Sequence, residues 1–489
     1  MIFNSYIFVL VFLPVTIIIY NLFNRYKCYN CAKISLILLS LVFYSYYNYS
    51  LLFLITASVT GNFICYKLIR GVKNDSTRKL ICILFCVLNL IILFYFKYFN
   101  FFIENINFIF AKSILVEKII LPLGISFFTF QQLSFIIDIY RNQEINYSFI
   151  DYFLYIVFFP QLVAGPIVLH NELIPQINNP EKKTINYDYM YKGLYLLGFG
   201  LAKKVILADN LGKVVTYGLL DLQDLGTINT CILILSYTLQ IYIDFSAYSD
   251  MATGISKFFN FDLPQNFNSP YRSISINEFW KRWHMTLTRF LRSYVYIPLG
   301  GNRKGILITY RNMFIVFLLS GIWHGANWTF ILWGILHGVM MIIEKLNCSL
   351  FNKIPNCIRW LFTFIFINIT FILFRSDSIS HFFQIIEQLF AFTTLKPNLM
   401  MLMSMYITEL SLLITPILSL FKIQYTYIQF IVISIFYSTI LLVILKSDNL
   451  YNKTNKLAPS FFSSLFIMVA LLLSILSFSA SSEFLYFNF

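Results

Sequence analysis

The chain alternates long apolar runs with short polar connections along its whole length of 489 residues. Clear examples of the apolar runs are residues 2–23, 80–96, 425–445 and 461–478. Each run is close to the roughly 20 residues that an α-helix needs to cross a bilayer, and we count about eleven to fourteen such segments. No polar stretch is long enough to fold as a soluble domain. The pattern predicts an all-α polytopic membrane protein with one membrane domain, residues 1–489.

Composition and charge agree with this prediction. The chain is 58% hydrophobic and 12% charged, with a mean hydropathy of +0.72, which is far from the balance of a soluble globular domain. The first apolar run has neither a basic start nor a small-residue cleavage site, so we expect a retained membrane helix and not a signal peptide. The net charge of +14 is expected to lie in short cytoplasmic loops, and we expect no nucleic-acid partner.

The eight cysteines do not predict a metal site. Cys28 and Cys31 form the one Cys-x-x-Cys pair, and a zinc site needs a second pair of ligands that the sequence does not supply nearby. We therefore expect these two cysteines to be ordinary loop thiols and expect no bound metal.

The basic loops predict how the chain is oriented. Residues 25–33 and 70–79 are basic whereas the connection 47–50 carries no charge, which predicts an external N-terminus and internal basic loops. The longest polar stretch, residues 266–311, has one acid, Glu278, against eight cations: Arg272, Lys281, Arg282, Arg289, Arg292, Arg303, Lys304 and Arg311. This stretch should be cytoplasmic.

If every preceding apolar run crossed the membrane fully, residues 266–311 would lie outside. We therefore expect at least one run to enter and leave on the same side. Such re-entrant backbone is tolerated at membrane depth only when protein or a water-filled cavity surrounds it. The candidates are residues 123–140 and 236–254.

Two of the five histidines stand in unusual surroundings. His284 lies in the basic stretch and His324 lies in an apolar run, and imidazole is well suited to proton transfer near neutral pH. An ionisable group at membrane depth is costly and often functional, although a satisfied interhelical hydrogen bond is the alternative. Gly321 and Gly325 would allow a close approach to His324, and Trp323 and Trp328 could wall a pocket. These neighbours favour a functional site.

The remaining histidines are assigned smaller roles. His337 lies between Gly334 and Gly338, which is typical of a packed small-residue helix interface, so we expect it to support the site. We expect no catalytic role for His170 or His381.

The stretch 275–296 alternates aromatic residues with cations. It could be an interfacial helix with Trp anchors and snorkelling cations. Alternatively it could bind an anionic acyl donor, because Arg and Lys bind phosphates and Trp can stack on a base. The candidate donor-binding residues are Trp280, Lys281, Arg282, Trp283, Arg289 and Arg292.

Several motifs are more specific. The runs QNFNSPY (265–271), EFWKRWH (278–284) and YIPLGGNRKG (296–305) are accompanied by PLGISF (122–127), PQLVAGP (160–166), KKVILADN (203–210), DFSAYSD (244–250) and GIWHG (321–325). Together they resemble the membrane-bound O-acyltransferase (MBOAT) family, most closely its alginate O-acetyltransferase branch. The motif-rich catalytic core covers about residues 120–345, and residues 395–489 are expected to form C-terminal membrane helices.

The resemblance implies a ring of membrane and re-entrant helices around a tunnel that joins a cytoplasmic donor pocket to the outer face. The family's membrane-embedded histidine corresponds to His324, and its second histidine corresponds to His284. The implied reaction moves an acetyl or other acyl group from a co-substrate such as acetyl-CoA to a hydroxyl of a cell-envelope or exported polysaccharide. An extracytoplasmic esterase-like or acetyltransferase partner and the inner (cytoplasmic) membrane are implied as well, with no bound cofactor.

Our mechanistic hypothesis makes His324 the general base and lets His284 hold or orient the donor. The thioester oxygen could be stabilised by the indole of Trp323 or Trp328 or by the amide of Asn327. Asp250 and Asn266 are further pocket candidates, and we expect Asp250 to bond to His284. Transfer of D-alanine to teichoic acid, a transporter or flippase, and a purely structural membrane scaffold remain as alternatives.

Overall fold

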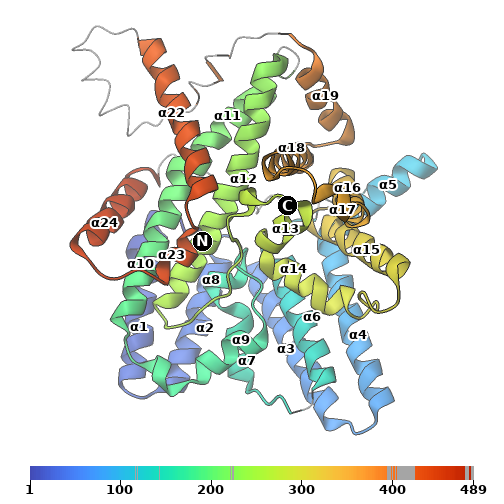
Figure 1. Ribbon diagram of the computed structural model, residues 1–489. Helices are drawn as coiled ribbons and strands as arrows, with labels where there is room; N and C mark the ends of the chain where they lie inside the picture. The colour runs from blue at the N-terminus through green and yellow to red at the C-terminus, as the bar shows by residue number, and fades with distance from the viewer. Residues whose placement is uncertain are drawn as a thin grey trace. The chain divides into compact units, whose positions relative to one another are not determined.

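The computed structural model describes the chain except for residues 116, 118, 143, 221, 223–224, 394–397, 399, 402–403, 405–424, 479–483 and 486–489. All regular elements in the described part are helices (Figure 1). The contacts divide the chain into two compact units, residues 1–197 with 251–264 and residues 198–250 with 265–489. Helices α10 (Tyr187–Ala202) and α12 (Gly226–Lys257) contribute to both units. The single membrane domain therefore stays a prediction.

Seven described helices are long and apolar enough to cross a membrane, and three shorter apolar helices accompany them. Large apolar side chains on several of these helices are exposed, for example Leu80, Leu84 and Ile91 of α4 (Asp75–Leu93). An exposed apolar surface of this kind would be a liability in water but fits contact with lipid. The predicted all-α polytopic architecture is confirmed, whereas the number of crossings stays a prediction.

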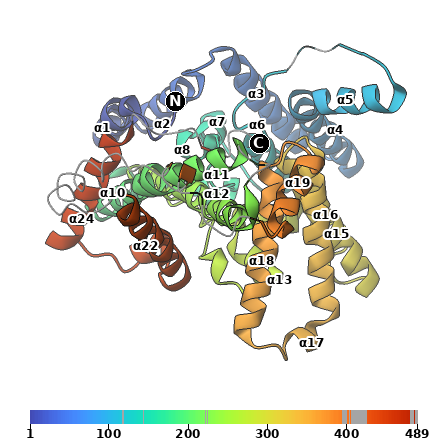
Figure 2. The same ribbon diagram turned by 90° about the horizontal axis from the view of Figure 1, so that it is seen from above.

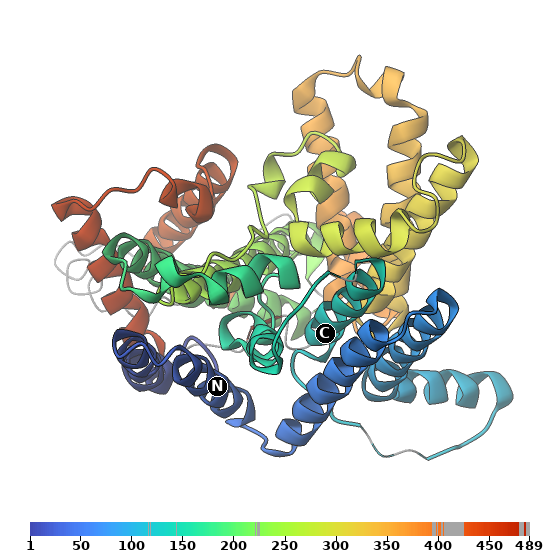
Figure 3. The ribbon, with the colours of Figure 1, turned by 90° about the horizontal axis from the view of Figure 1, so that it is seen from below.

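The first unit is a helical assembly in which α3, α4 and α6 pack on one another (Figure 3). Some of its buried polar side chains pair with one another: Lys33 and Asp151 form an ion pair of 2.6 Å, and Asn62 bonds to Asn89. Its helices are α1 (Leu13–Arg25), α2 (Tyr29–Ser45), α3 (Ser50–Gly71), α4, α5 (Phe99–Phe110), α6 (Ile125–Arg141), α7 (Phe149–Val157), α8 (Phe159–Leu162), α9 (His170–Asn178) and the first part of α10, with η1 (Phe8–Phe12), η2 (Phe94–Tyr98) and η3 (Pro180–Lys183).

The second unit holds α15, α16 and α18, which pack in succession (Figure 2). Its elements are η4 (Lys203–Ala208), α11 (Asp209–Leu220), most of α12, η5 (Pro270–Arg272), α13 (Ile276–Arg282), α14 (Met285–Leu291), η6 (Arg292–Tyr296), α15 (Ile306–His324), α16 (Trp328–Leu346), α17 (Cys348–Phe351), α18 (Asn356–Arg375), α19 (Ile379–Phe390), α22 (Tyr425–Lys446), α23 (Leu450–Thr454) and α24 (Phe461–Leu476). Part of the predicted C-terminal helical region, 395–489, lies outside the described residues.

The two re-entrant candidates have different outcomes. Residues 236–254 lie inside α12, which is one continuous helix of 32 residues, so the prediction of a re-entrant piece there is wrong. Helix α6 has 17 residues and is buried over most of its length. It begins after Gly124, whose φ is +73° and where a Cβ would lie 2.5 Å from the Leu162 carbonyl oxygen. A short helix enclosed by protein is compatible with the re-entrant role, which stays a prediction.

Candidate functional site

His284 is held in a defined turn between α13 and α14. Ser275 precedes helix α13 and caps it: its hydroxyl accepts the amide of Glu278 at 3.0 Å, as an N-cap does. His284 itself has φ +42°, a left-handed conformation that is uncommon for a residue with a side chain. The backbone of Asn266 accepts the amide of Met285 at 2.9 Å. The loop 266–268 therefore helps to fix the position of the imidazole.

The hydrogen bonds of Asn266 define the protonation of His284. The amide oxygen of Asn266 lies 3.1 Å from His284 Nδ1 and accepts the hydroxyl of Thr286 at 2.9 Å, while its Nδ2 donates to Ser249 at 3.3 Å. An amide oxygen can only accept, so Nδ1 must carry the hydrogen and Nε2 must present its lone pair. Burial lowers the pKa of His284 from 6.5 to about 3, so the ring is neutral at pH 7.

The expected bond between His284 and Asp250 is wrong. Asp250 pairs instead with Lys203 at 2.7 Å, and Lys203 also donates to Ser246 at 2.7 Å. A cation close in space but distant in sequence thus satisfies the carboxylate. Asn266, which we predicted as a pocket residue, takes the place next to His284.

His324 ends α15 and lies close to His284, with 6.4 Å between the ring centroids. Trp323 packs on His284 at a centroid distance of 5.9 Å. Trp333 and Phe374 pack edgewise on His324 at 5.2 and 5.0 Å. His284 and His324 are 0% and 4% exposed. The structure thus brings the two predicted histidines together within an aromatic enclosure.

Trp333 is a residue of this site that the sequence interpretation missed. Its side chain is fully buried, and its indole N–H has no hydrogen-bond partner among the described residues. A buried donor without a partner is costly and is often explained by function. The sequence alone did not distinguish Trp333 from its neighbours, because Trp323 and Trp328 lie in the same apolar run.

The hydrogen-bond donors predicted near His324 differ in how close to it they lie. Trp328 is 52% exposed, so it does not wall a closed pocket as we expected. Asn327 caps α16 by accepting the amide of Thr329 at 3.0 Å and donates to the carbonyl oxygen of Asp377 at 2.9 Å. Both groups of its side-chain amide therefore form hydrogen bonds with the backbone. Among the predicted donors, Trp323 contacts the histidines.

His337 links three helices by hydrogen bonds. Trp280 donates to His337 Nδ1 at 3.2 Å, so the hydrogen of the neutral ring lies on Nε2, which is 3.2 Å from the Thr370 hydroxyl. Thr370 in turn donates to the Phe366 carbonyl oxygen at 2.9 Å. This arrangement joins α13, α16 and α18 and agrees with a supporting role.

A basic cavity of about 480 Å³ lies where α15 begins, α16 ends and α18 begins. One acid, Glu344, lines it, and its carboxylate accepts the amides of Ile276 and Asn277 at 2.6 and 3.1 Å. The cations that line the cavity are Lys281, Arg292, Lys345 and Arg359. Such a set of cations beside apolar side chains suits an anionic ligand.

Three of the six predicted donor-binding residues line this cavity, namely Trp280, Lys281 and Arg292. The other three do not. Arg282 pairs with Glu278 at 2.8 Å. Trp283 belongs to the core, where its ring lies 5.4 Å from that of Phe279, and Arg289 lies on α14.

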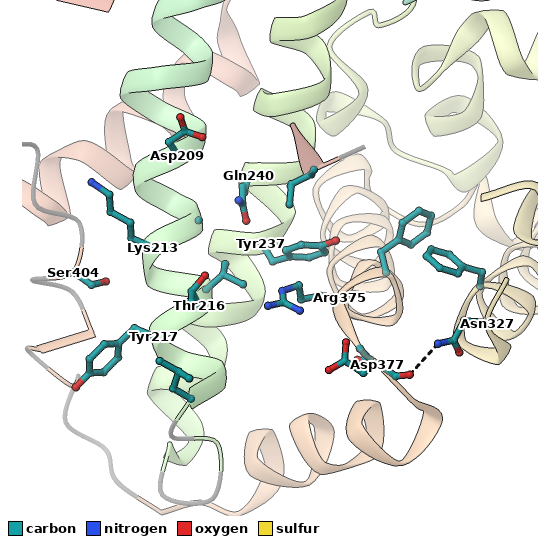
Figure 4. Close-up of a pocket in the computed structure, with 17 residues that line it drawn as sticks. Asp209, Lys213, Thr216, Tyr217, Tyr237, Gln240, Asn327, Arg375, Asp377 and Ser404 are labelled. Carbon is teal, nitrogen blue, oxygen red and sulfur yellow. Dashed lines mark hydrogen bonds between the residues drawn. The ribbon is translucent and has the colours of Figure 1, made fainter. Parts of the chain in front are cut away.

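A second cavity, of about 870 Å³, lies at the other end of the same helices, where α15 and α18 end and α16 begins (Figure 4). Helices α11 and α12 form its opposite wall, with Tyr237 and Gln240 on α12. Phe374 lines this cavity and also packs on His324. One aromatic ring thus separates the larger cavity from the histidine.

Two motif runs meet beside this cavity through buried charges. Lys204 lies 2.9 Å from Asp209 and 2.8 Å from Asp244. Asp244 also accepts the amide of Leu485 at 2.8 Å. This pairing satisfies charges that would be costly alone, and it explains why the 203–210 and 244–250 runs carry complementary residues. In the described part of the chain, no group of three or more His, Cys, Asp or Glu residues could hold a metal ion.

The fold and site define a multispanning membrane protein with two buried imidazoles near cavities at both ends of a helix bundle. The model of the membrane-bound O-acyltransferase family matches residues 39–376. The chain therefore belongs to this family, and the predicted enzyme class, an O-acyltransferase, is confirmed.

Individual relatives agree with this assignment. The chain is 39% identical over 363 residues to the peptidoglycan O-acetyltransferase of Helicobacter pylori, covering 68% of this chain and 69% of that protein. It is 38% identical over 330 residues to the probable alginate O-acetylase of Pseudomonas aeruginosa, covering 66% and 62%. A teichoic acid D-alanyltransferase of Bacillus subtilis is 26% identical over 279 residues, covering 53% and 70%. The matches span about two thirds of the length of these relatives.

Proposed function

We propose that this protein transfers an acetyl group from a cytoplasmic thioester, such as acetyl-CoA, to a hydroxyl of a cell-envelope or exported polysaccharide. The observation that carries the proposal is the pair of buried imidazoles, His284 and His324, whose centroids lie 6.4 Å apart. Two relatives with about 39% identity are named for O-acetylation of peptidoglycan and alginate. The enzyme acts in the inner membrane and hands the acetyl group to an extracytoplasmic partner protein.

The two cavities form the ends of the tunnel between donor and acceptor. The smaller cavity adjoins the basic stretch 266–311 and is lined by four cations, so the positive-inside rule assigns it to the cytoplasm. Its cations bind the phosphates of the donor. Trp280 packs on Trp333 at 5.5 Å, and Trp333 packs on His324 at 5.2 Å. This row of rings leads from the donor cavity to the reacting histidine.

His324 acts as general base. It takes the proton of the acceptor hydroxyl while the hydroxyl oxygen attacks the thioester carbonyl carbon. The carbon–sulfur bond then breaks, and the proton passes from His324 to the leaving thiolate. General-base catalysis of this kind contributes roughly 10²- to 10⁴-fold. His284, neutral and held by Asn266, offers Nε2 as an acceptor that orients the donor.

Trp333 supplies a donor for the carbonyl oxygen that becomes negative in this step. Its indole N–H is buried and has no partner among the described residues, and its ring packs on His324. A preorganised donor in a dry site stabilises a developing oxyanion without reorganisation. This role replaces the one that we expected of Trp328.

The proposal is tested by supplying radiolabelled acetyl-CoA to the purified protein in nanodiscs, together with its glycan acceptor and partner fraction. We expect His324→Ala to lower label transfer at least about 100-fold. The matched control is His381→Ala, because His381 lies on α19 and is partly exposed. Full transfer by a folded His324→Ala protein would overturn the assignment.

The same assay separates the second candidate, D-alanyl transfer, which the 26% identical teichoic acid D-alanyltransferase supports. Transfer from a D-alanyl thioester but not from acetyl-CoA would favour that function.

A further inference from the structure

Phe374 lies between His324 and the cavity of about 870 Å³. Its side chain is 7% exposed and lines the cavity. It also packs edgewise on His324 at 5.0 Å, on Trp333 at 4.9 Å and on Phe330 at 4.9 Å. Edgewise ring pairs are favourable, so three of them together oppose displacement of the ring. Phe374 thus belongs both to the wall of the cavity and to the enclosure of the imidazole.

The backbone next to Phe374 is tied to a second helix. Phe374 lies in the last turn of α18. Just beyond this helix, the Asp377 carbonyl oxygen accepts the side-chain amide of Asn327 at 2.9 Å (Figure 4). Asn327 is the N-cap of α16. The end of α18 is therefore joined to the start of α16, which gives the ring a defined place beside His324.

The cavity that Phe374 borders suits water. Its polar lining includes Tyr237, Gln240, Arg375 and Asp377. One water molecule occupies about 30 Å³ of the liquid, so a polar cavity of this volume can hold many of them. A base that removes a proton from an acceptor hydroxyl can remove one from water as well. The ring therefore lies where an acyl-transfer reaction needs protection from water.

We propose that Phe374 is a specificity-determining residue, which keeps cavity water away from His324 and so favours acyl transfer over hydrolysis. This inference rests on the proposed function, in which His324 is the general base, and deepens it. Without the ring, a water oxygen would attack the thioester carbonyl carbon while His324 takes a proton from that water. The carbon–sulfur bond would then break, the proton would pass from His324 to the thiolate, and the products would be a carboxylic acid and a thiol.

The same position lets the ring move when an acceptor arrives. One face of the enclosure is packed with other rings, whereas the cavity offers room on the other. An acceptor that enters the cavity can displace the water and turn the ring aside. The thioester is then exposed to the acceptor hydroxyl and not to bulk water.

The first test measures how easily a reagent reaches His324, and it needs neither donor nor acceptor. Diethyl pyrocarbonate, which reacts with an imidazole nitrogen that carries no proton, is added to the intact protein in nanodiscs. Mass spectrometry identifies the modified histidines. We expect Phe374→Ala to raise the rate at His324 at least about 10-fold, because three ring pairs no longer oppose access. His381, which is partly exposed, is the internal standard and should react equally in both proteins.

Tyr217→Ala is the matched control, because it removes a ring from the opposite wall of the same cavity. It should leave the rate at His324 unchanged. Melting curves establish that each variant is folded, and Phe374→Leu serves if the alanine variant does not fold. An unchanged rate at His324 in the folded Phe374 variant would overturn the inference. An equal gain at the fully buried His337 would overturn it too, because it would show general loosening.

The second measurement follows the thiol that is released from acetyl-CoA when no acceptor is present. Phe374→Ala should release it about 10-fold faster than the unmodified protein or more, and the further change His324→Ala should abolish the gain. Faster modification of His324 without faster hydrolysis would support the control of access by Phe374. That result would instead count against His324 as the base, and hence against the proposed function.

Discussion

His284 combines an uncommon backbone conformation with complete burial, and both follow from its bonds to the loop 266–268. The φ of +42° turns the imidazole toward Asn266 and Trp323. Asn266 then sets the tautomer by accepting from Nδ1. The surrounding rings, including Phe245 at 4.9 Å, disfavour the charged form because they exclude water.

This burial predicts how stability depends on pH. The pKa of His284 falls from 6.5 to about 3 on folding, so between these values the unfolded chain binds a proton that the folded chain does not. The stability that comes from keeping His284 neutral is therefore complete above pH 6.5 and declines as the pH falls. At pH 5 the loss is about 2 kcal/mol. We expect the melting temperature to fall between pH 7 and pH 5, and to fall less for His284→Gln than for the unmodified protein.

The control for this measurement is His381→Gln, whose side chain is partly exposed. It should keep the pH dependence of the unmodified protein. Identical drops for His284→Gln and the unmodified protein would show that His284 does not titrate on unfolding as described.

Trp333→Phe tests the proposed oxyanion donor, since it removes the indole N–H and keeps an aromatic ring. We expect kcat for acetyl transfer to fall about 10²- to 10³-fold, as on removal of one oxyanion-hole donor, with KM for the donor little changed. Trp360→Phe is the control, because its indole donates to the Tyr271 carbonyl oxygen at 2.8 Å. That variant should lose stability while keeping kcat. Equal kcat losses in both variants would exclude a special role for Trp333.

At the level of elements, α15 and α16 meet through glycines. A Cβ on Gly321 would collide with the Phe330 carbonyl oxygen, and a Cβ on Gly334 would lie 2.6 Å from the Phe317 carbonyl oxygen. The two backbones are therefore in direct contact, which the small side chains permit. His324 lies less than one turn beyond Gly321, so this contact also positions the imidazole of His324.

Gly321→Ala should force the two helices apart. We expect a loss of about 1–3 kcal/mol, typical of overpacking, together with a fall in kcat because His324 moves. Gly61→Ala on α3 is the matched control, since a Cβ there meets nothing within 4 Å. That change should be neutral or slightly stabilising. Melting temperatures and transfer rates measure both effects, and an unchanged Gly321→Ala protein would contradict the close contact.

The sequence predicted the apolar helices and singled out His284 and His324 as site candidates. It did not predict which side chains would pack or bond beside them. Motif runs identified His284 and His324 by their context. Trp333 was missed because the face it presents depends on how α16 packs on α15. The same limit explains α12: its polar residues suggested a re-entrant piece, whereas Lys203 and Lys204 pair with its carboxylates and the helix is continuous.

At the scale of the whole molecule, α15, α16 and α18 carry a basic cavity at one end and the cavity with Arg375 at the other. The proposed function requires these ends to face opposite sides of the membrane. The positive-inside rule assigns the basic end to the cytoplasm because cations in short loops are retained there. Hydropathy alone could not predict the two cavities, since it shows which helices cross but not what lies between them.

Cysteine labelling tests this orientation. The native cysteines are replaced by Ser, and single cysteines are introduced as Arg303→Cys in the basic stretch and Asp377→Cys, whose position follows α18 and is exposed. A membrane-impermeant maleimide added to intact spheroplasts should label Asp377→Cys and spare Arg303→Cys. Permeabilisation should then expose Arg303→Cys. Labelling of both positions in intact spheroplasts, or the reverse pattern, would contradict transfer from a cytoplasmic donor through this bundle, because donor and acceptor cavities would then not face opposite compartments as assigned.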